Sequence, residues 1–392
     1  MEGKTYGELI PPNRILLGPG PSNVDPRVLK AMSTPLVGHL DPYFLELMDE
    51  TMELLRCVFR TKNRLCIPIS GTGSAGMEAA VCNIVERRDE VIVGVNGLFG
   101  ERMSDVVTRC GGKSIEVKEE WGRAISKEAV EKALSESNAK VVGIVQAETS
   151  TGVLQPLAEI SELAKEYGAL FLVDTVTSLG GCELNVDELG IDICYSGTQK
   201  CLNCPPGLAP ITFNEKAMDL VRNRKTKVQS WYLDLSLIEK YWSEGRVYHH
   251  TAPISMIYGL REALRIIHEE GLEKRWERHK SNSLALISGV EATGLKMHPP
   301  DHRAPSLNSI AVPSGVPDLD VRKTLLNNFN IEIGGGLGVL KGKIWRVGLM
   351  GLNSNERNVM LFLDALGRIL KNLGYPAEPV KGIEAAMKAY GE

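Results

Sequence analysis

The stretch PLAEISELAKEYGALFLVD, residues 156–174, decides the fold class of this chain. Residues 156–168 have a helical pattern with a proline near the start, which predicts an α-helix. Residues 169–174 form an apolar run that ends in an acid, which predicts a strand buried on both faces. A buried strand that directly follows a helix is typical of a mainly parallel sheet between layers of helices.

The same alternation extends over the first two thirds of the chain. Apolar, β-branched runs predict further strands at residues 64–70, 91–95 and 140–146, and in the segments IDICYSG and LAPITF. Helical patterns lie between them, at residues 74–90 and in LFGERMSDVVTRCG. The sequence therefore predicts an α/β fold.

The pattern changes near Pro253. Two long helical stretches meet near Gly271, and the shorter segments NSIAVP, NIEIGGG and KIWRVGL follow before the helical stretch ERNVMLFLDALGRILKNLG. This mixture is typical of a smaller α+β unit. We therefore predict an N-terminal arm at residues 1–21, a large domain at residues 22–270 and a small C-terminal domain at residues 271–392.

Composition and charge argue against several classes of protein. The 392 residues are 43% hydrophobic, and 45 basic against 49 acidic residues give a net charge of -4. This balance lacks the basic footprint of a protein that binds nucleic acid or an anionic membrane, and no apolar run is long enough to span a bilayer. The N-terminal MEGKTYGELIPPN does not match a signal peptide, and the C-terminal AYGE does not match a peroxisomal signal. We expect a cytoplasmic protein.

Eight cysteines are spread thinly along the chain, unlike a disulfide framework. Cys201 and Cys204 make a CxxC pair, but no second pair completes a zinc site. The PPG that follows this pair forces a turn, whereas a thioredoxin-type pair begins a helix. We expect both cysteines to be packing or loop residues, and we expect no metal site.

A glycine-rich segment, SGTGSAG at residues 70–76, lies between a predicted strand and a predicted helix. It matches the G-x-G-x-x-G pattern of dinucleotide-binding proteins, but the next strand ends at Asn96 instead of the acid that would hold a ribose. Small residues and hydroxyl groups at a helix N-terminus still favour a phosphate, because the N–H groups there are free. A glycine-rich turn capped by Ser74 is the alternative.

Asp174 and Lys200 are the two other candidates. Asp174 ends an apolar strand, where α/β folds place ligands, although a capping aspartate is the alternative. Lys200 lies in YSGTQKCLNCPPG; most lysines are on the surface, but these flanking residues predict a tight, shaped loop. A phosphate site, an aspartate and a lysine in this order are what a pyridoxal phosphate enzyme needs.

Eight motifs carry a resemblance to a known family: LLGPGPSNVDPRVL, SGTGSAGMEAA, ETSTGVLQPL, LVDTVTSLGG, YSGTQKCLNCPPG, YHHTAP, IEIGGGLG and WRVGLMG. Together they resemble the alanine–glyoxylate/serine–pyruvate aminotransferases, which are class V aminotransferases with the type I, aspartate aminotransferase-like fold. The resemblance covers roughly residues 10 to 370. It implies pyridoxal 5'-phosphate as cofactor and a homodimer with shared active sites.

The resemblance also implies catalytic and substrate-binding roles. Lys200 would form the Schiff base and then act as the base, and Asp174 would keep the pyridine nitrogen protonated. Arg346 would bind the substrate carboxylate, and Gly20 would line the substrate side together with Thr149. A structural ion-pair role for Arg346 is the alternative.

Further residues would bind the cofactor. Its phosphate would be held by Thr72, Gly73, Ser74 and Gln199. The partner chain would reach the same phosphate with Tyr248 and Thr251, although an ordinary interface loop is the alternative for these two. The pyridine ring would lie between Phe99 and Val176, with Thr149 near its 3-hydroxyl.

The reaction implied by the resemblance moves an amino group from alanine or serine to glyoxylate or another 2-oxo acid by ping-pong kinetics. Related class V aminotransferases that use aspartate, aminoethylphosphonate or hydroxykynurenine are the first alternative. A nucleotide-binding oxidoreductase is the alternative from another class, and Asn96 argues against it.

Overall fold

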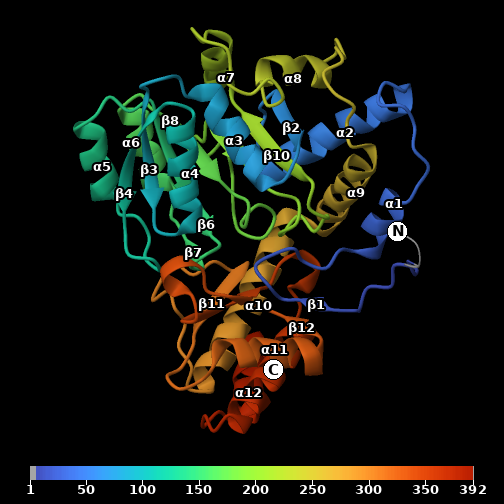
Figure 1. The fold of residues 1–392 in the computed structure, drawn as a ribbon, viewed down its shortest axis with the longest axis vertical. Helices are drawn as coiled ribbons and strands as arrows, with labels where there is room; N and C mark the ends of the chain where they lie inside the picture. Colours follow the sequence, from blue (N-terminus) through green and yellow to red (C-terminus); the bar gives the residue numbers. More distant parts are fainter. Residues whose placement is uncertain (1–5, 392) are drawn as a thin grey trace.

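The central element of the structure is a seven-stranded sheet with helices on both faces (Figure 1). The structure is a computed structural model that describes residues 6–391. The strands, in their order across the sheet, are β2 (Leu65–Ser70), β10 (Leu208–Phe213), β9 (Ile193–Tyr195), β8 (Leu170–Asp174), β5 (Val141–Val145), β3 (Glu90–Val95) and β4 (Lys113–Lys118). Only β10 runs antiparallel to its neighbours in this sheet. The predicted α/β fold with a mainly parallel sheet is therefore confirmed.

Helices from the first 270 residues surround this sheet. They are α1 (Pro26–Met32), α2 (Pro42–Phe59), α3 (Gly73–Ile84), α4 (Leu98–Arg109), α5 (Lys127–Ser135), α6 (Ala158–Glu166), α7 (Glu215–Arg222), α8 (Leu235–Trp242) and α9 (Ile254–Glu270). A short hairpin, β6 (Ala147–Glu148) with β7 (Val153–Leu154), follows β5. The stretch that predicted the fold class forms α6 and β8.

One predicted helix is too long. The pattern at residues 74–90 predicted a single helix, but α3 ends at Ile84. Beyond it, the backbone N–H of Glu86 donates to the Asp89 carboxylate at 2.9 Å, and Arg88 has a positive φ of 72°. This local side-chain bond competes with the helix and turns the chain into β3.

The C-terminal part is a smaller α+β unit in the lower half of Figure 1. Its elements are α10 (Leu272–Ala292), β11 (Leu307–Ala311), α11 (Asp318–Phe329), β12 (Ile331–Glu332), β13 (Gly334–Gly335), β14 (Ile344–Gly348), α12 (Glu356–Asn372), α13 (Pro379–Tyr390) and two 3-10 turns, η1 (Gly338–Leu340) and η2 (Gly351–Asn353). Strand β14 pairs antiparallel with both β11 and β13. The N-terminal strand β1 (Ile15–Leu16) pairs with β12, so the first strand of the chain lies along this unit.

Two hydrophobic cores underlie the two parts. One is formed by buried residues between positions 28 and 267, and the other by Leu17 with residues between positions 285 and 386. These cores agree with the division near residue 271, and the exact boundaries stay a prediction. Within residues 6–391, no helix is long and apolar enough to cross a membrane.

Candidate active site

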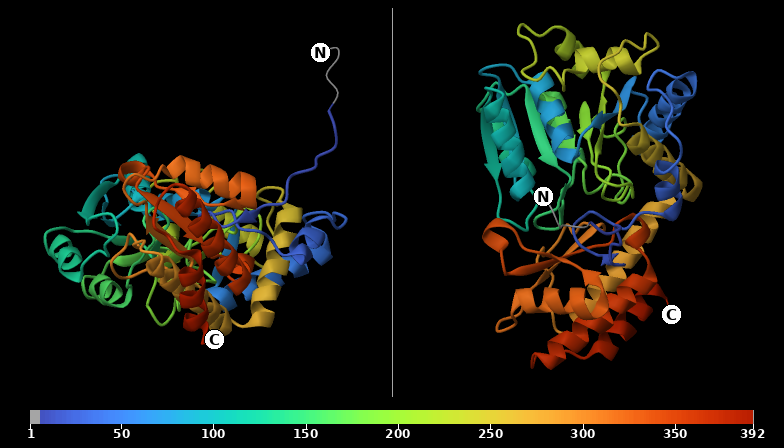
Figure 2. Two further views of the ribbon diagram at one scale, coloured as in Figure 1. Left: turned by 90° about the horizontal axis from the view of Figure 1, so that it is seen from below. Right: turned by 45° about the vertical axis from the view of Figure 1, so that its right-hand side comes forward.

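The candidate site lies where the carboxyl ends of the strands face the C-terminal part. Figure 2 (right) shows the arrows of the parallel strands pointing towards that part. Asp174 and Tyr195 end the neighbouring strands β8 and β9 and are paired in register. Ligand sites of open α/β sheets lie at this edge, and the predicted residues of the large domain gather there, except Tyr248 and Thr251.

Asp174 is held on two sides, and no ion pair within residues 6–391 includes it. Its side chain accepts a 2.7 Å bond from the Tyr195 hydroxyl and a 2.8 Å bond from the Val176 backbone N–H. Burial raises the pKa of Asp174 to about 6 and that of Tyr195 well above its usual value. Because a carboxylate can accept further bonds, Asp174 can receive one from a protonated ring nitrogen.

Lys200 is buried beside the N-terminal arm. Its Nζ donates to the Pro19 carbonyl, and a Cβ added to Gly20 would lie 2.6 Å from Nζ. Gly20 also has a φ of 105°, so glycine at this position allows the arm to lie against the lysine. Burial and then the charge of Arg346 lower the pKa of Lys200 to about 8. A neutral amine, which is the form that acts as nucleophile and base, is therefore accessible near neutral pH.

Arg346 enters from β14 of the C-terminal part. Its Nε donates to the Gly335 carbonyl at 2.8 Å and its Nη1 donates to the Thr149 carbonyl at 3.0 Å. The residue is 6% exposed, and no ion pair within residues 6–391 includes it. Burial lowers its pKa to about 10. Nη2 and one N–H of Nη1 remain able to bind a ligand carboxylate, and the role of Arg346 in binding the substrate stays a prediction.

The N-terminus of α3 has the features of a phosphate site. Thr72 is the N-cap residue, but its side chain makes no capping bond. A Cβ added to Gly73 would lie 3.0 Å from Val176, so glycine allows this helix end to approach the loop after Asp174. Nearby, the side-chain oxygen of Gln199 is buried and lacks a hydrogen-bond partner within the described residues. Free N–H groups and exposed hydroxyls fit a bound phosphate, and the Gln199 amide fits once it is turned so that its NH2, not its oxygen, faces the anion.

Phe99 is oriented by an acid that the sequence-based prediction missed. Glu148 is 1% exposed and accepts bonds from the backbone N–H groups of Phe99 (3.1 Å) and Gly100 (3.2 Å). Its other oxygen accepts from the backbone and hydroxyl of Ser150. Glu148 thus caps the first turn of α4 and holds the backbone that carries the Phe99 ring. An acid directly after a buried strand, in QAETS, was the available signal.

Thr149 lies at the boundary between the two parts. Its hydroxyl is 2.5 Å from that of Thr177, in the loop after Asp174, and its carbonyl binds Arg346. The predicted residue is therefore in the site, where it joins the cofactor side to the substrate side. Its predicted bond to the 3-hydroxyl stays a prediction.

Tyr248 and Thr251 are the predicted residues that the structure does not bring into the site. Both side chains are exposed, and the Tyr248 ring lies 5.4 Å from the ring of His39. Between them, His250 is 2.8 Å from the hydroxyl of Ser70, at the start of the phosphate segment. Their predicted role, in the site of a second chain, stays a prediction.

The CxxC pair is buried in the loop that carries Lys200. Burial raises the pKa of Cys201 and of Cys204 to about 12, so that neither is a reactive thiolate. Asn203, which lies between the two cysteines, has a φ of 62° and links two parts of the chain. Its amide donates to the Ser22 hydroxyl and accepts from the Leu352 backbone N–H, so it joins the segment just after the N-terminal arm to the C-terminal part.

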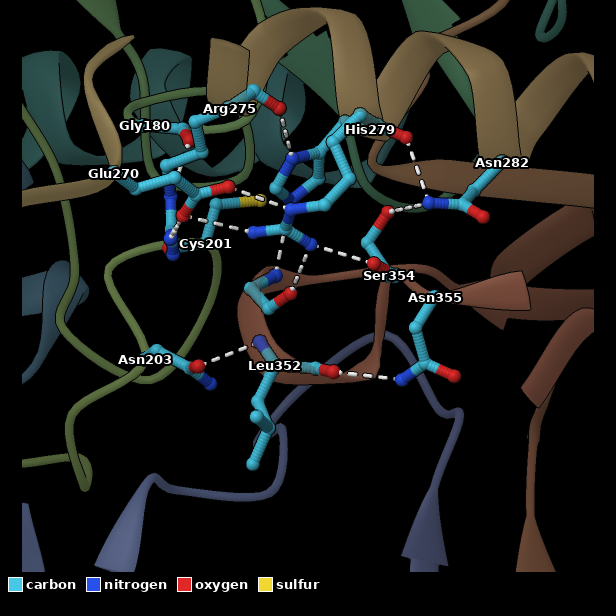
Figure 3. Close-up of polar contacts among 12 residues, drawn as sticks. Gly180, Cys201, Asn203, Glu270, Arg275, His279, Asn282, Leu352, Ser354 and Asn355 are labelled. Atoms are coloured by element: carbon cyan, nitrogen blue, oxygen red, sulfur yellow. Dashed lines mark hydrogen bonds and ion pairs between the residues drawn. The ribbon is translucent and has the colours of Figure 1, made fainter. Parts of the chain in front are cut away.

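A charged network at the start of α10 holds the loops behind the site (Figure 3). Arg275 is 2% exposed and donates to the carbonyls of Gly180 (3.0 Å) and Cys201 (2.7 Å), while Glu270 pairs with its third nitrogen. These carbonyls belong to the loop that follows Asp174 and to the residue after Lys200. One buried guanidinium therefore joins the two loops that carry the predicted catalytic groups.

His279, one turn further along α10, joins this network to the C-terminal part (Figure 3). Its Nδ1 lies 2.7 Å from the Arg275 carbonyl, which can only accept, so Nδ1 carries the proton. Its Nε2 then accepts from the Gly351 backbone N–H at 3.0 Å. Burial, together with the charges of Arg275 and Arg278, lowers the pKa of His279 to about 3 and keeps it neutral.

Comparison with known proteins identifies the family. A model of the family described as Aminotransferase class-V matches residues 15–357. The (S)-ureidoglycine–glyoxylate transaminase of Bacillus subtilis is 41% identical, with 98% of this chain and 97% of that protein covered. Its crystal structure superimposes with a TM-score of 0.96 at 42% identity, over 98% of this chain and all of that one.

Two alanine–glyoxylate aminotransferases are also similar to this chain. The Nostoc crystal structure has a TM-score of 0.92 and 48% identity, and covers 94% of this chain and 98% of its own. The Rattus norvegicus protein is 41% identical, with 92% of this chain and 88% of that protein covered. The residues at the strand ends also fit the cofactor of this family. The chain therefore belongs to the class V aminotransferases, which are pyridoxal-phosphate-dependent enzymes.

Proposed function

We propose that this chain transfers the amino group of alanine or serine to glyoxylate. The observation that carries the proposal is the buried guanidinium of Arg346, which has no acidic partner in the described chain and lies close enough to Lys200 to lower its pKa. A carboxylate bound there places the Cα of a small amino acid next to the lysine amine. The relatives from Nostoc and Rattus norvegicus, named for alanine and glyoxylate, support this choice.

Each residue has a part in the proposed chemistry. Bound pyridoxal phosphate supplies a carbonyl group for the amine and an electron-accepting ring. Lys200 would move the proton at the substrate Cα, and Asp174 would hold a proton at the ring nitrogen of the bound cofactor. Arg346 holds the carboxylate with its planar fork, and Phe99 with Val176 fixes the plane of the ring. Because donor and acceptor would use the same Arg346 and Lys200 in turn, the expected kinetics are ping-pong.

A single free guanidinium on the substrate side favours a monocarboxylic substrate. The neighbouring Arg322, which lies against Gly335, is bound by Asp318 through two bonds of 2.8 and 2.9 Å. Arg322 is therefore already paired and does not offer a second binding site for the side-chain carboxylate of an aspartate substrate. This argues against the alternative in which the donor is a dicarboxylic amino acid.

A second candidate donor is (S)-ureidoglycine, because the relative named for it matches this chain over 98% of its length. It shares with alanine the single carboxylate that Arg346 can bind, and it shares glyoxylate as the named acceptor. The two candidates therefore differ only in the donor side chain.

The absorbance spectrum of the purified protein tests both candidates. We expect a yellow cofactor band that bleaches when the donor is added and returns when glyoxylate is added. Alanine, serine and (S)-ureidoglycine are compared at equal concentration, with Lys200→Ala as the control that cannot complete the cycle. A band that none of the three donors bleaches contradicts the donor assignment, and a protein that stays colourless with pyridoxal phosphate contradicts the whole proposal.

We also propose that the active form is a cytoplasmic homodimer in which Tyr248 and Thr251 complete the partner's phosphate site. Their exposure, next to His250 at the start of the phosphate segment, supports this arrangement. Mixing Lys200→Ala with Tyr248→Ala chains tests it, since the mixed dimer would contain one intact site. We expect activity to recover on mixing; two weak variants that stay weak together contradict a shared site.

A further inference from the structure

Arg102 lies beside the phosphate site but was not among the predicted residues. It is in the second turn of α4, three residues after Phe99, so both side chains lie on the same face of the helix. Its guanidinium carbon is 4.7 Å from the centre of the Phe99 ring. This is the distance of a cation–π contact, which holds the guanidinium next to the ring expected to stack on the cofactor.

The same guanidinium contacts the hydroxyl of Ser74 across the gap between α4 and α3. Nη1 of Arg102 lies 3.2 Å from the Ser74 oxygen. Because a guanidinium can only donate, the Ser74 oxygen accepts this bond, and its own hydrogen stays free to donate elsewhere. Ser74 is the second residue of α3, where the backbone N–H groups also point out of the helix end.

The positive charge of Arg102 beside the phosphate site has no acidic partner among the described residues. No ion pair within the described residues 6–391 includes Arg102, whereas Arg109 at the end of the same helix pairs with Asp105 at 2.7 Å. A free guanidinium next to the N-terminus of α3 places two positive features side by side, since the helix end carries partial positive charge. Such a pair becomes favourable when a dianion lies between them.

We propose that Arg102 is a positioning residue for the cofactor phosphate, which turns the Ser74 hydroxyl towards the phosphate and adds one full positive charge to the site. The proposal rests on the proposed phosphate site at Thr72, Gly73 and Ser74. It assigns to Arg102 an effect on the phosphate alone, because the contact with Ser74 and the charge both act at that end of the cofactor.

Binding of pyridoxal phosphate and of pyridoxal to the apoprotein tests the proposal. The two ligands differ only in the phosphate. We expect Arg102→Gln to raise the Kd for pyridoxal phosphate about tenfold and to leave the Kd for pyridoxal unchanged within about twofold. Arg102→Lys should recover part of the loss, since it restores the charge without the planar fork. The matched control is Arg109→Gln, on the same helix, which should change neither Kd.

Two results would overturn the proposal. Equal weakening of both ligands by Arg102→Gln would mean that the residue acts through the Phe99 ring, and unchanged binding of both would mean that it is an ordinary surface arginine. Failure of the unaltered chain to bind pyridoxal phosphate would instead contradict the proposed function, so the two failures are distinguishable.

The double variant Ser74→Ala with Arg102→Gln separates the two parts of the effect. If Arg102 acts by orienting Ser74, the loss in the double variant is smaller than the product of the two single losses. Fully independent losses would contradict the orienting role. Inorganic phosphate as a competitor of pyridoxal phosphate gives a readout that does not depend on catalysis: its inhibition constant should rise in Arg102→Gln and stay unchanged in Arg109→Gln.

Discussion

The phosphate end of the site, at the start of α3, and the loops behind Lys200 are built differently. At the phosphate end, the Thr72 side chain does not cap its helix, the Gln199 oxygen is unsatisfied, and Arg102 lacks an acidic partner among the described residues. Behind Lys200, by contrast, Arg275 is bound by Glu270 and two carbonyls, and the two nitrogens of His279 are both engaged. Within this site, the polar groups left unbonded are the ones available to a ligand, whereas the fully bonded groups hold the loops in place.

From this contrast we expect the largest loss of activity at Lys200, which the groups at both ends of the site support. Lys200→Ala removes the amine that we propose as the nucleophile and base, so kcat for transamination should fall by at least about 10⁴-fold. Steady-state kinetics with the preferred donor measure the loss. The variant should still bind pyridoxal phosphate, because the phosphate end is untouched; residual activity within about tenfold of the unaltered chain would contradict the assignment.

The fully bonded end should respond as a scaffold. Arg275→Met leaves Glu270 and two buried carbonyls without this partner, and the free energy of unfolding should fall by about 3–5 kcal/mol. Urea unfolding of the apoprotein measures it. The matched control is Arg265→Met on α9, whose pairs with Glu262 and Glu269 are partly exposed and should contribute at most about 1 kcal/mol. Equal losses in the two variants would contradict a special role for Arg275.

The two ends also differ in how far sequence reasoning could describe them. Asp174 and the phosphate segment lie at strand ends, a position that local pattern identifies without a structure. In the sequence GLEKRWERHK, Arg275 is one of several charged residues, and this pattern predicts a helix that is exposed to solvent. Only the fold brings it to Gly180 and Cys201, which are 95 and 74 positions away. Whether a charged residue stabilises the structure therefore depends on which distant segments of the chain bury it, and the residue type alone does not predict this.

Glu148 lies between these extremes, because it is buried and bonded but supports a cofactor-binding residue. Glu148→Gln replaces one acceptor oxygen by a donor, so the N–H groups of Phe99 and Gly100 or those of Ser150 lose a partner. We expect the Kd values of pyridoxal phosphate and of pyridoxal to rise together, by up to about tenfold, because ring stacking is weakened and the phosphate end is not. Fluorescence or absorbance titration of the apoprotein measures both, and Ser150→Ala, which keeps the carboxylate, should show a smaller rise. Weakening of pyridoxal phosphate alone would contradict this role.

The smallest expected effect concerns the charge that Arg346 places near Lys200. Burial first, and Arg346 second, lower the pKa of Lys200 to about 8, so the neutral amine forms as pH rises through 8 instead of through its usual value above 10. The rate at which the apoprotein forms its yellow band with pyridoxal should therefore rise with pH and level off above about 8. In Arg346→Met the positive neighbour is gone, which favours the protonated amine, so the midpoint should move to higher pH. An unmoved midpoint would mean that burial alone sets the pKa, and that the two parts of the molecule meet at Lys200 without electrostatic coupling.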